Sequence, residues 1–351
     1  HGKDSATAHL GYGPHWEGAL VTIPWQMYLY SGDKSILKEN YEAMKKYLAH
    51  LENVSTNYLL NFGIDDHKSI ITHTEGAYIS SAYFHWLTKI MADVAAVLEK
   101  PEDKIRFTEL GKKIFGSFND RYYDSSKSVY GNGGQTQMAL ALGCGLVTEE
   151  NHDKVLTQLI KKIEENDYHF DCGVVGLKKI IDVLLENNRK DVLYKLATRT
   201  DFPSIGHWIE QGANTMWQNW DGSQSRNHIM FGSIGDYFYQ GLAGIEPVQE
   251  TPGFEKIKIS PQFPDDLSSM KCGHKCKYGW IKTSYSINEN EYTYQLEIPE
   301  KSIATLTLPF NQNSIRIEEN KEILKTSQPN TTTYELKGGR FTFKIEKQPP
   351  F

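Results

Sequence analysis

The chain has 351 residues and a net charge of −6, with 39% hydrophobic and 23% charged residues. This length allows one large domain with a smaller one, and the composition is that of an ordinary globular protein. The mild negative charge argues against a nucleic acid or an anionic membrane surface as a partner. No stretch reaches the roughly 18 apolar residues of a membrane span, and no signal peptide is visible.

Residues up to about 245 show helical periodicity with Gly-rich connections. The segment 15–30 has few surface-type residues, as expected of a helix that is buried on most sides. In 36–51, apolar residues recur every three to four positions opposite lysines, at Leu37, Tyr41, Met44, Leu48 and Leu51. Further helices are predicted at 76–98, 101–118, 134–143, 149–165, 173–187, 189–199 and 228–243. This pattern favours paired helices packed around an axis.

The character of the sequence changes after residue 245, where several prolines mark a linker-like region. Short alternating runs then predict antiparallel strands of a sandwich, at 280–287, 292–298, 304–308, 314–317 and 340–345. The run 331–333 followed by Lys337-Gly338-Gly339 predicts a strand and a hairpin turn. We therefore expect a helical domain at 1–245 and a β-domain at 246–351.

The stretch 212–221 combines two tryptophans with amide and carboxylate side chains, which is the composition of a sugar-binding site. Trp217 and Trp220 offer indole faces on which a sugar ring stacks. Gln218 lies between them, and a glutamine holds a sugar hydroxyl but cannot take a proton from water at neutral pH. For any single aromatic residue, a place in the core remains the alternative.

Glycoside cleavage requires two acid/base groups that flank the scissile bond. The candidate carboxylates lie near loops or element ends and are Glu17, Asp65, Asp66, Glu210 and Asp221. A helix cap or a surface carboxylate is the alternative for each. His67 and His228 could donate hydrogen bonds to sugar hydroxyls, and an ordinary hydrogen-bonded histidine remains the alternative for both.

Other chemistries find little support in the sequence. The chain has 4 cysteines, and Cys272 and Cys276 with His274 between them could suggest a metal or a disulfide. A zinc site needs about four ligands and no second pair is present, so we expect no metal and no cofactor. The serine-hydrolase elbow, the phosphate-binding loop and the HExxH zinc motif are all missing from the sequence.

Several segments together resemble the bacterial α-L-rhamnosidases of glycoside hydrolase family 78. The family's Gly-Trp-Gly-Asp-Ala segment that leads to Pro-Trp is similar to His15–Ala19 with Pro24-Trp25. Its Trp-Glu-x-Trp segment is similar to Trp217–Trp220. The matching segments occur in one order at compatible spacing, at 15–25, 62–67, 130–142, 202–220 and 227–239.

The resemblance implies an (α/α)6 barrel that lacks its first helices in this chain, followed by a C-terminal β-sandwich. It implies an inverting hydrolysis of terminal α-L-rhamnosides, with two carboxyl groups about 6.5–9.5 Å apart. In the family, the glutamate between the two tryptophans is the general base, and here Gln218 takes that position. The family's general acid lies upstream of the Trp16 segment, so an N-terminal segment or a second chain is implied to complete the barrel.

The resemblance also assigns the pocket. Trp16 matches a pocket tryptophan and is our choice for the contact to the rhamnose methyl group, and His228 matches the pocket histidine. Further substrate contacts are expected at Glu17, Asp66, His67, Glu210, Trp217 and Trp220. His67 replaces a tryptophan and Glu17-Gly18 replaces Gly-Asp, so the subsite could accept a different aglycone or neighbouring sugar.

Three functions are compatible with these residues. The first is a rhamnosidase whose activity is impaired by Gln218. The second is a rhamnoside-binding protein without hydrolysis, and the third is another (α/α)6 enzyme, such as a polysaccharide lyase or an unsaturated-glucuronyl hydrolase that uses Asp65 or Asp66. The expected partner is a rhamnose-containing oligosaccharide, polysaccharide or glycoside. This substrate class favours a periplasmic or secreted location.

Overall fold

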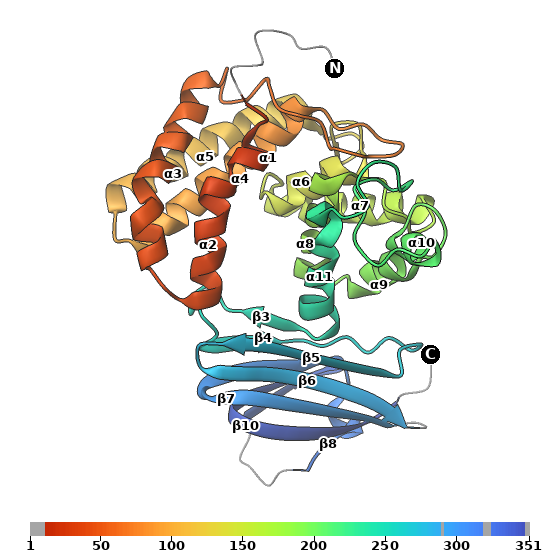
Figure 1. Ribbon diagram of the computed structural model, residues 1–351. Coiled ribbons are helices and arrows are strands. Elements are labelled where there is room, and N and C mark those ends of the chain that lie inside the picture. The colour runs from red at the N-terminus through yellow and green to blue at the C-terminus, as the bar shows by residue number, and fades with distance from the viewer. Residues whose placement is uncertain (1–10, 289–290, 319–323, 348–351) are drawn as a thin grey trace. The chain divides into compact units, whose positions relative to one another are not determined.

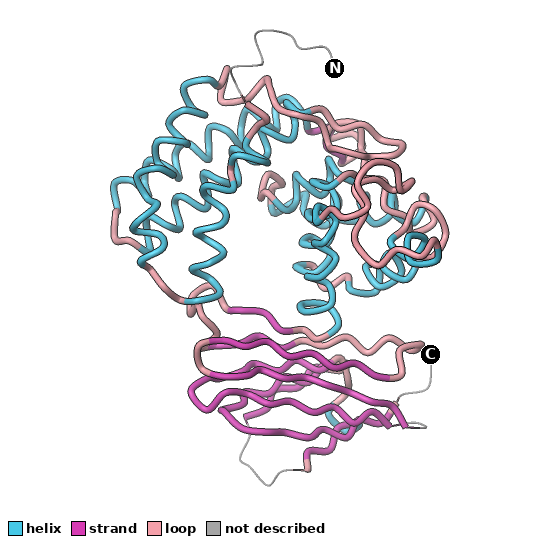
Figure 2. Tube along the Cα trace, in the orientation of Figure 1, coloured by secondary structure: helices cyan, strands magenta, loops and turns pink. Residues whose placement is uncertain are grey.

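The computed structural model describes residues 11–288, 291–318 and 324–347. The chain forms two compact units, one from residues 1–25 and 34–234 and the other from residues 26–33 and 235–351. The first unit is helical and the second is built mainly from strands (Figures 1 and 2). The predicted class, mainly helical with a C-terminal β-domain, agrees with this organisation.

The helical unit consists of helices joined by loops of varied length. Its helices are α1 (Pro14–Glu17), the first part of α2 (Ala19–Ser31), α3 (Ser35–Val54), α4 (Gly76–Val97), α5 (Pro101–Tyr122), α6 (Gln135–Gly143), α7 (Glu149–Glu165), α8 (Val174–Glu186), α9 (Lys190–Thr198) and α10 (Ile205–Glu210). Neighbouring helices pack in pairs, α4 against α5, α6 against α7 and α8, and α8 against α9. This pairing is the arrangement that the sequence predicted.

The apolar pattern of α3 explains how the helices pack. Leu37, Tyr41, Met44, Leu48 and Leu51 are all buried, as their spacing predicted. α5 begins with Pro101 at its first turn, and the acidic side chain of Asp103 follows. Asp103 accepts hydrogen bonds from the Tyr41 hydroxyl at 2.7 Å and from Lys45 Nζ at 2.7 Å, so the start of α5 is fastened to α3.

Three segments of the helical part differ from the prediction. The expected helix at 228–243 is instead a 3₁₀ helix η2 (Ile229–Ser233), a short α11 (Ile234–Asp236) and a π-helix η3 (Tyr237–Leu242). Helix α10 was not predicted, because six residues are too few to show a period. A small hairpin of β1 (Tyr123–Asp124) and β2 (Val129–Tyr130) was also not predicted.

The second unit contains an eight-stranded sheet. Its strands are β3 (Ile245–Pro247), β4 (Lys256–Ile259), β5 (Ser269–Cys276), β6 (Gly279–Asn288), β7 (Glu291–Leu308), β8 (Ile315–Ile317), β9 (Leu324–Gln328) and β10 (Thr331–Glu346), with a 3₁₀ turn η4 (Gln312–Ser314). The order is β3-β4-β7-β10-β8, β5 and β6 extend from β7, and β9 pairs with β10. All pairs are antiparallel except β4 with β7. The core of this unit includes Tyr294 and Leu306 of β7 and Phe343 of β10, which are all buried.

Two strand predictions are wrong. The runs 292–298 and 304–308 were expected as separate strands, but they form the single strand β7, which continues through Pro299. The hairpin expected at Lys337-Gly338-Gly339 is a register shift within the continuous strand β10. A bulge inserts an extra residue without reversing the chain, and a Gly-Gly pair serves either structure, so the sequence could not separate the two.

The Cys272–Cys276 segment lies on β5, where the two residues are separated by four positions along one strand. A rise of about 3.3 Å per residue places them too far apart for a disulfide, and both are free thiols. Within the described ranges, no helix has the length and apolar character required to cross a membrane.

Candidate active site

Gln218 lies in the loop that follows α10, and the two limbs of this loop are joined by backbone hydrogen bonds. The Gln218 N–H donates to the Ser225 carbonyl at 2.9 Å, and the His228 N–H donates to the Met216 carbonyl at 2.8 Å. The side-chain nitrogen of Gln218 is 3.5 Å from Nε2 of His67. Residues 151 positions apart in sequence therefore meet at the position that the sequence marked as the general base.

His67 belongs to the loop between α3 and α4 and remains partly exposed. Its carbonyl accepts the Val174 N–H at 3.1 Å, which joins the loop to the start of α8. Burial lowers the pKa of His67, and the nearby charges of Lys68 and His228 lower it further. The imidazole is therefore neutral at pH 7, with one ring nitrogen free to accept a proton or a hydrogen bond.

His228 lies close enough to His67 to contribute to the lowering of the His67 pKa. It precedes η2, and its Nδ1 accepts the Met230 N–H at 3.3 Å. In the neutral ring this bond places the proton on Nε2, which is then available as a donor. Gln218, His67 and His228 together form a polar cluster of one amide and two imidazoles.

Asp66 is buried directly behind His67, with 3% of its surface exposed. Its carboxylate accepts hydrogen bonds from the Thr136 hydroxyl at 2.7 Å and from the N–H groups of Gly173, Val175 and Gly176 at 2.7, 3.0 and 3.3 Å. Burial raises its pKa, and these hydrogen bonds partly offset the rise. Since protein donors occupy its oxygens, the structure gives Asp66 a role in holding α8 and His67 in place.

Trp217 and Trp220 lie beneath the loop in an aromatic cluster with Trp208 and Phe231. Ring centroids are 5.2 Å apart for Trp208–Trp220, 5.9 Å for Trp208–Trp217 and 4.6 Å for Trp220–Phe231. Trp217 is 5% exposed and Trp220 is 2% exposed. The Trp220 indole N–H donates to the Cys172 carbonyl at 2.9 Å. Both side chains therefore support the Gln218 loop. Because both rings are buried, a sugar cannot stack on them in this arrangement.

Trp16 and Glu17 lie on α1 and differ in exposure. Trp16 is 42% exposed, so part of its indole is accessible to a ligand. Oε1 of Glu17 accepts the Tyr12 N–H at 2.9 Å, and Oε2 lies 3.4 Å from the Tyr47 hydroxyl. Among the described residues, no hydrogen bond or ring contact joins these two side chains to Gln218, His67 or His228.

The remaining carboxylates have local roles. Asp65 accepts the Gly76 N–H at 2.7 Å at the start of α4, and it pairs with His73 at 3.3 Å. Asp221 accepts the N–H and the hydroxyl of Ser223, which lower its pKa. Glu210 is exposed at the end of α10. Among the residues that the structure describes, no pair of free carboxylates is brought together at Gln218.

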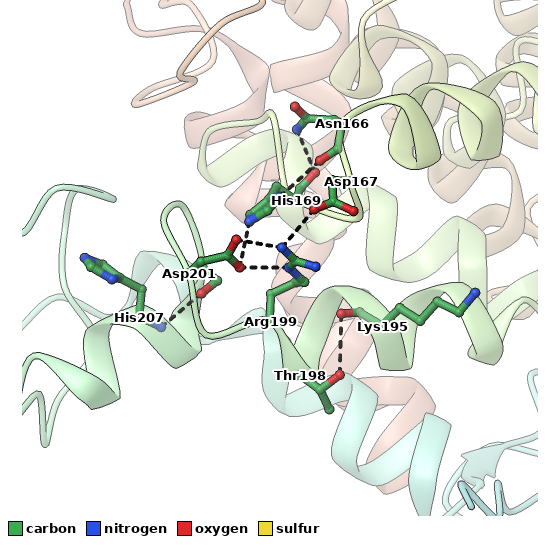
Figure 3. Close-up of polar contacts among 9 residues, drawn as sticks. Asn166, Asp167, His169, Lys195, Thr198, Arg199, Asp201 and His207 are labelled. Atoms are coloured by element: carbon green, nitrogen blue, oxygen red, sulfur yellow. Dashed lines mark hydrogen bonds and ion pairs between the residues drawn. The ribbon is translucent and has the colours of Figure 1, made fainter. Parts of the chain in front are cut away.

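One group of possible metal ligands is Asp167, His169 and Asp201, and Arg199 already pairs with both of its carboxylates (Figure 3). Arg199 Nη2 is 3.0 Å from Asp167 and 2.6 Å from Asp201, and His169 Nε2 is 3.0 Å from Asp201. The arginine lowers the pKa of Asp201 to about 2. The Arg199 guanidinium supplies the positive charge that a metal ion would otherwise bring to this group, and it holds the segment that leads into α10.

Sequence reasoning did not select two residues that position the site. Asp171 accepts the Ile71 and Thr72 N–H groups at 2.8 and 3.1 Å, which pins the loop that carries His67. Lys68 acts on the pKa of both His67 and Asp221. An acidic residue inside the apolar stretch Phe170–Gly173 was the available signal for Asp171.

Comparison with known proteins places this geometry in a family. Residues 5–242 match the bacterial alpha-L-rhamnosidase 6 hairpin glycosidase domain, and residues 244–323 match the bacterial alpha-L-rhamnosidase C-terminal domain. An alpha-L-rhamnosidase of Formosa agariphila is 29% identical over 95% of this chain and 38% of its own length. One of Streptomyces avermitilis is 26% identical over 97% of this chain and 34% of its own length.

Solved structures agree with these matches. The alpha-L-rhamnosidase of Streptomyces avermitilis complexed with L-rhamnose has a TM-score of 0.86 at 25% identity, over 93% of this chain and 32% of its own. The alpha-L-rhamnosidase from Dictyoglumus thermophilum has a TM-score of 0.86 at 29% identity, over 95% of this chain and 40% of its own. The chain thus spans about a third of the length of these relatives. The predicted fold class and resemblance are confirmed, and the chain belongs to the bacterial α-L-rhamnosidases of glycoside hydrolase family 78.

Proposed function

We propose that the protein containing this chain acts on terminal α-L-rhamnosides as an inverting glycoside hydrolase, and that Gln218 impairs its hydrolysis. The observation that carries the proposal is the contact of Gln218 with His67, in the segment that matches the family's general-base motif. The relatives named alpha-L-rhamnosidase and the neighbour complexed with L-rhamnose support the substrate class. The substrate is a rhamnose-containing glycoside, oligosaccharide or polysaccharide.

Inversion requires a base that removes a proton from water while the water attacks the anomeric carbon. The amide of Gln218 can orient that water but cannot accept its proton. His67 is neutral, and its Nε2 lies 3.5 Å from the side-chain nitrogen of Gln218. Among the described residues, His67 is therefore the titratable group that contacts Gln218. Any proton transfer at this position therefore runs through a weaker and less well-placed base, and slow turnover follows.

The remaining site residues receive roles in the same proposal. Trp16, with its open indole, packs against the rhamnose methyl group, and His228 donates from Nε2 to a sugar hydroxyl. Glu17 and Glu210 contact the substrate or its neighbouring sugar. Asp66, Trp217 and Trp220 act by holding the loops of His67 and Gln218. The Asp66 oxygens and the Trp220 N–H are already hydrogen-bonded, and the Trp217 ring lies against Trp208 and Arg226.

Turnover of an aryl α-L-rhamnoside by the full-length protein tests the hydrolase proposal. Gln218→Glu is expected to raise kcat by about 10²–10⁴-fold, the usual worth of a general base. His67→Gln in the native background is expected to abolish the residual turnover, whereas in the Gln218→Glu background it leaves most of the rate. Fast turnover by the native protein with no gain from Gln218→Glu would refute the assigned position of the base.

A rhamnose-binding protein without hydrolysis is the second candidate, and the amide at position 218 is the observation that favours it. Calorimetric titration with L-rhamnose separates the two. Binding with no turnover in either the native protein or the Gln218→Glu form supports the binding protein. Absence of both binding and turnover contradicts the substrate class itself.

We further propose that another segment of the protein, or a second chain, packs against α2. This helix buries Val21, Trp25 and Tyr28 but leaves Leu20, Ile23 and Met27 at 39, 55 and 50% exposure. A helix that is apolar on all sides is normally covered on all sides. The relatives extend well beyond the matched region, since the chain covers 38% of the Formosa agariphila protein.

Hydrogen exchange of α2 amides tests this packing. We expect stronger protection of 19–31 in the full-length protein than in residues 1–351 alone. Ile23→Lys should weaken that protection, whereas Glu39→Lys on an exposed position of α3 should not. Equal protection of α2 in both proteins would contradict the proposal.

A further inference from the structure

One face of the β-sheet carries a polar hollow that the proposed rhamnoside chemistry does not use. The hollow has a volume of about 330 Å³ and is lined by residues of β5, β6, β7 and β10. It falls at the lower end of the range for small-ligand pockets, about 300–1,000 Å³. We refer to the outward side chains of these four strands as the outer sheet face.

The register of the strands aligns these side chains in rows. One row joins Lys271, Ser284, Gln295 and Thr342, which lie directly opposite one another on successive strands. Residues opposite each other on neighbouring strands point to the same side, about 5 Å apart. This row therefore presents a cation followed by three neutral hydrogen-bonding groups.

The next row carries most of the charge. It joins Lys282, Glu297 and Arg340 in the same register. Lys282 and Arg340 lie 3.3 and 3.5 Å from the single carboxylate of Glu297. With Lys271, which pairs with no carboxylate in the described part of the chain, the lining holds three cations and one anion. The hollow is thus positive in a chain whose net charge is −6.

An exposed indole lies at one end of these rows. Trp280 on β6 is 46% exposed and lies opposite Lys275 of β5. Lys282 lies 5.9 Å from its ring centroid. This open indole lies two positions along β6 from Lys282 of the charged row, and an open indole suits the stacking of a sugar ring.

We propose that the outer sheet face binds an anionic glycan. The cations Lys271, Lys282 and Arg340 attract its acidic groups, Ser284, Gln295 and Thr342 bind its hydroxyls, and Trp280 stacks on one ring. The acidic groups are either uronate carboxylates or sulfates, since both suit a lysine and an arginine fork. The lining of this site shares no residue with the cluster at Gln218, and the proposal does not depend on the chemistry of that cluster.

Titration of the full chain with charged and neutral polymers tests the proposal. The probes are polygalacturonate for carboxylates, dextran sulfate for sulfates and unmodified dextran as the neutral control. We expect binding to one of the two acidic polymers, weaker at higher salt, and none to dextran. No binding to either acidic polymer at low salt, or equal binding to dextran, overturns the proposal.

Variants locate the binding. Lys271→Ala with Lys282→Ala is expected to weaken the affinity for the bound polymer about tenfold, and Trp280→Ala about threefold. The matched control is Lys325→Ala with Lys337→Ala, which removes the same charge from exposed positions outside the hollow. Its affinity should stay within about twofold of the native value.

A nucleic acid serves as the final comparison. A single-stranded oligonucleotide should bind more weakly than the acidic glycan at equal charge and salt. If the oligonucleotide binds as tightly, or if the control variant loses as much affinity as the hollow variant, the surface is a non-specific cation patch and the proposal fails. Circular dichroism of each variant establishes that the sheet is intact.

Discussion

The loop that carries Gln218 and the outer sheet face both place tryptophan beside polar groups, but they place the indole differently. Trp217 and Trp220 are 5 and 2% exposed under their loop, whereas Trp280 is 46% exposed on its strand. The sequence composition of the first region is the richer in sugar-type residues. Composition therefore identifies a region near a sugar site, while burial decides which indole a sugar can reach.

The difference has a physical origin in the hydrogen bonds of the indole N–H groups. Trp220 donates to the Cys172 carbonyl and Trp208 donates to the Trp220 carbonyl, so both rings are fixed inside the helical unit. A buried indole requires such a partner. Trp280 lies on the outward side of β6, where alternate residues face the solvent, so its ring stays exposed.

Alanine substitution of these tryptophans gives the largest expected contrast. Trp220→Ala should lower the free energy of unfolding by about 3–5 kcal/mol, because it leaves a cavity among Trp208, Phe231 and Phe170. Trp280→Ala should change it by less than about 0.5 kcal/mol. Urea unfolding followed by circular dichroism measures both. A small effect at Trp220 would mean that the aromatic cluster does not support the loop.

Removal of the Asp66 carboxylate is expected to cost somewhat less. Asp66→Ala leaves the N–H groups of Gly173, Val175 and Gly176 without their acceptor, which should cost about 2–3 kcal/mol. Hydrogen exchange at 173–176 should rise together with the loss of stability. Asp65→Ala, which removes one acceptor at the exposed start of α4, is the control and should cost about 1 kcal/mol. Equal costs for the two variants would contradict the framework role of Asp66.

Acid should destabilise the helical unit through His15. Both ring nitrogens of His15 are buried without a hydrogen-bond partner among the described residues, and burial lowers its pKa from 6.5 to about 4. Between these values the unfolded chain binds the proton and the folded chain does not, so stability falls as the pH drops from about 6.5 to about 4. The loss is at most about 3 kcal/mol, at about 1.4 kcal/mol for each pH unit.

Variants at two histidines check this pH dependence. In thermal unfolding scans from pH 7 to pH 4, His15→Leu should flatten the fall of Tm. His50→Leu removes an exposed histidine from α3 and should leave the slope unchanged. The same slope in both variants would place the acid sensitivity elsewhere, and His85 is the next group to replace, since burial also lowers its pKa to about 4.

Much of the fold could be predicted because the helices are indicated by local sequence signals. The five apolar residues of α3 and the Pro101 start of α5 are local signals, and the structure confirms both. The split of the chain at residue 245 into two domains stays a prediction. The continuous strands β7 and β10 could not be foreseen, because Pro299 and Gly338-Gly339 are ordinary turn signals that tertiary pairing overrides.

The candidate site was predictable in its segments but not in its contacts. The sequence selected Gln218, His67 and His228 as separate positions, and only the fold shows that His67 and Gln218 are in contact. The roles of Asp66 and Trp220 could not be read from the sequence, since their partners at 172–176 are far away in the chain. From the sequence alone, a substrate contact by Asp66 or Trp220 could not be distinguished from a role in holding the fold.

Removal of the cation near Trp217 or near Trp280 should give the smallest difference in unfolding free energy between the two regions. Arg226 lies 4.6 Å from the Trp217 ring centroid and donates from Nε to the Gly222 carbonyl at 3.0 Å, whereas Lys282 is 5.9 Å from Trp280. Arg226→Ala should cost about 1 kcal/mol of unfolding free energy, and Lys282→Ala almost nothing. A double-mutant cycle with Trp217→Phe isolates the ring contact. If Lys282→Ala costs as much as Arg226→Ala, the outer sheet face is as tightly organised as the Gln218 loop, and the contrast between buried and open indoles loses its energetic basis.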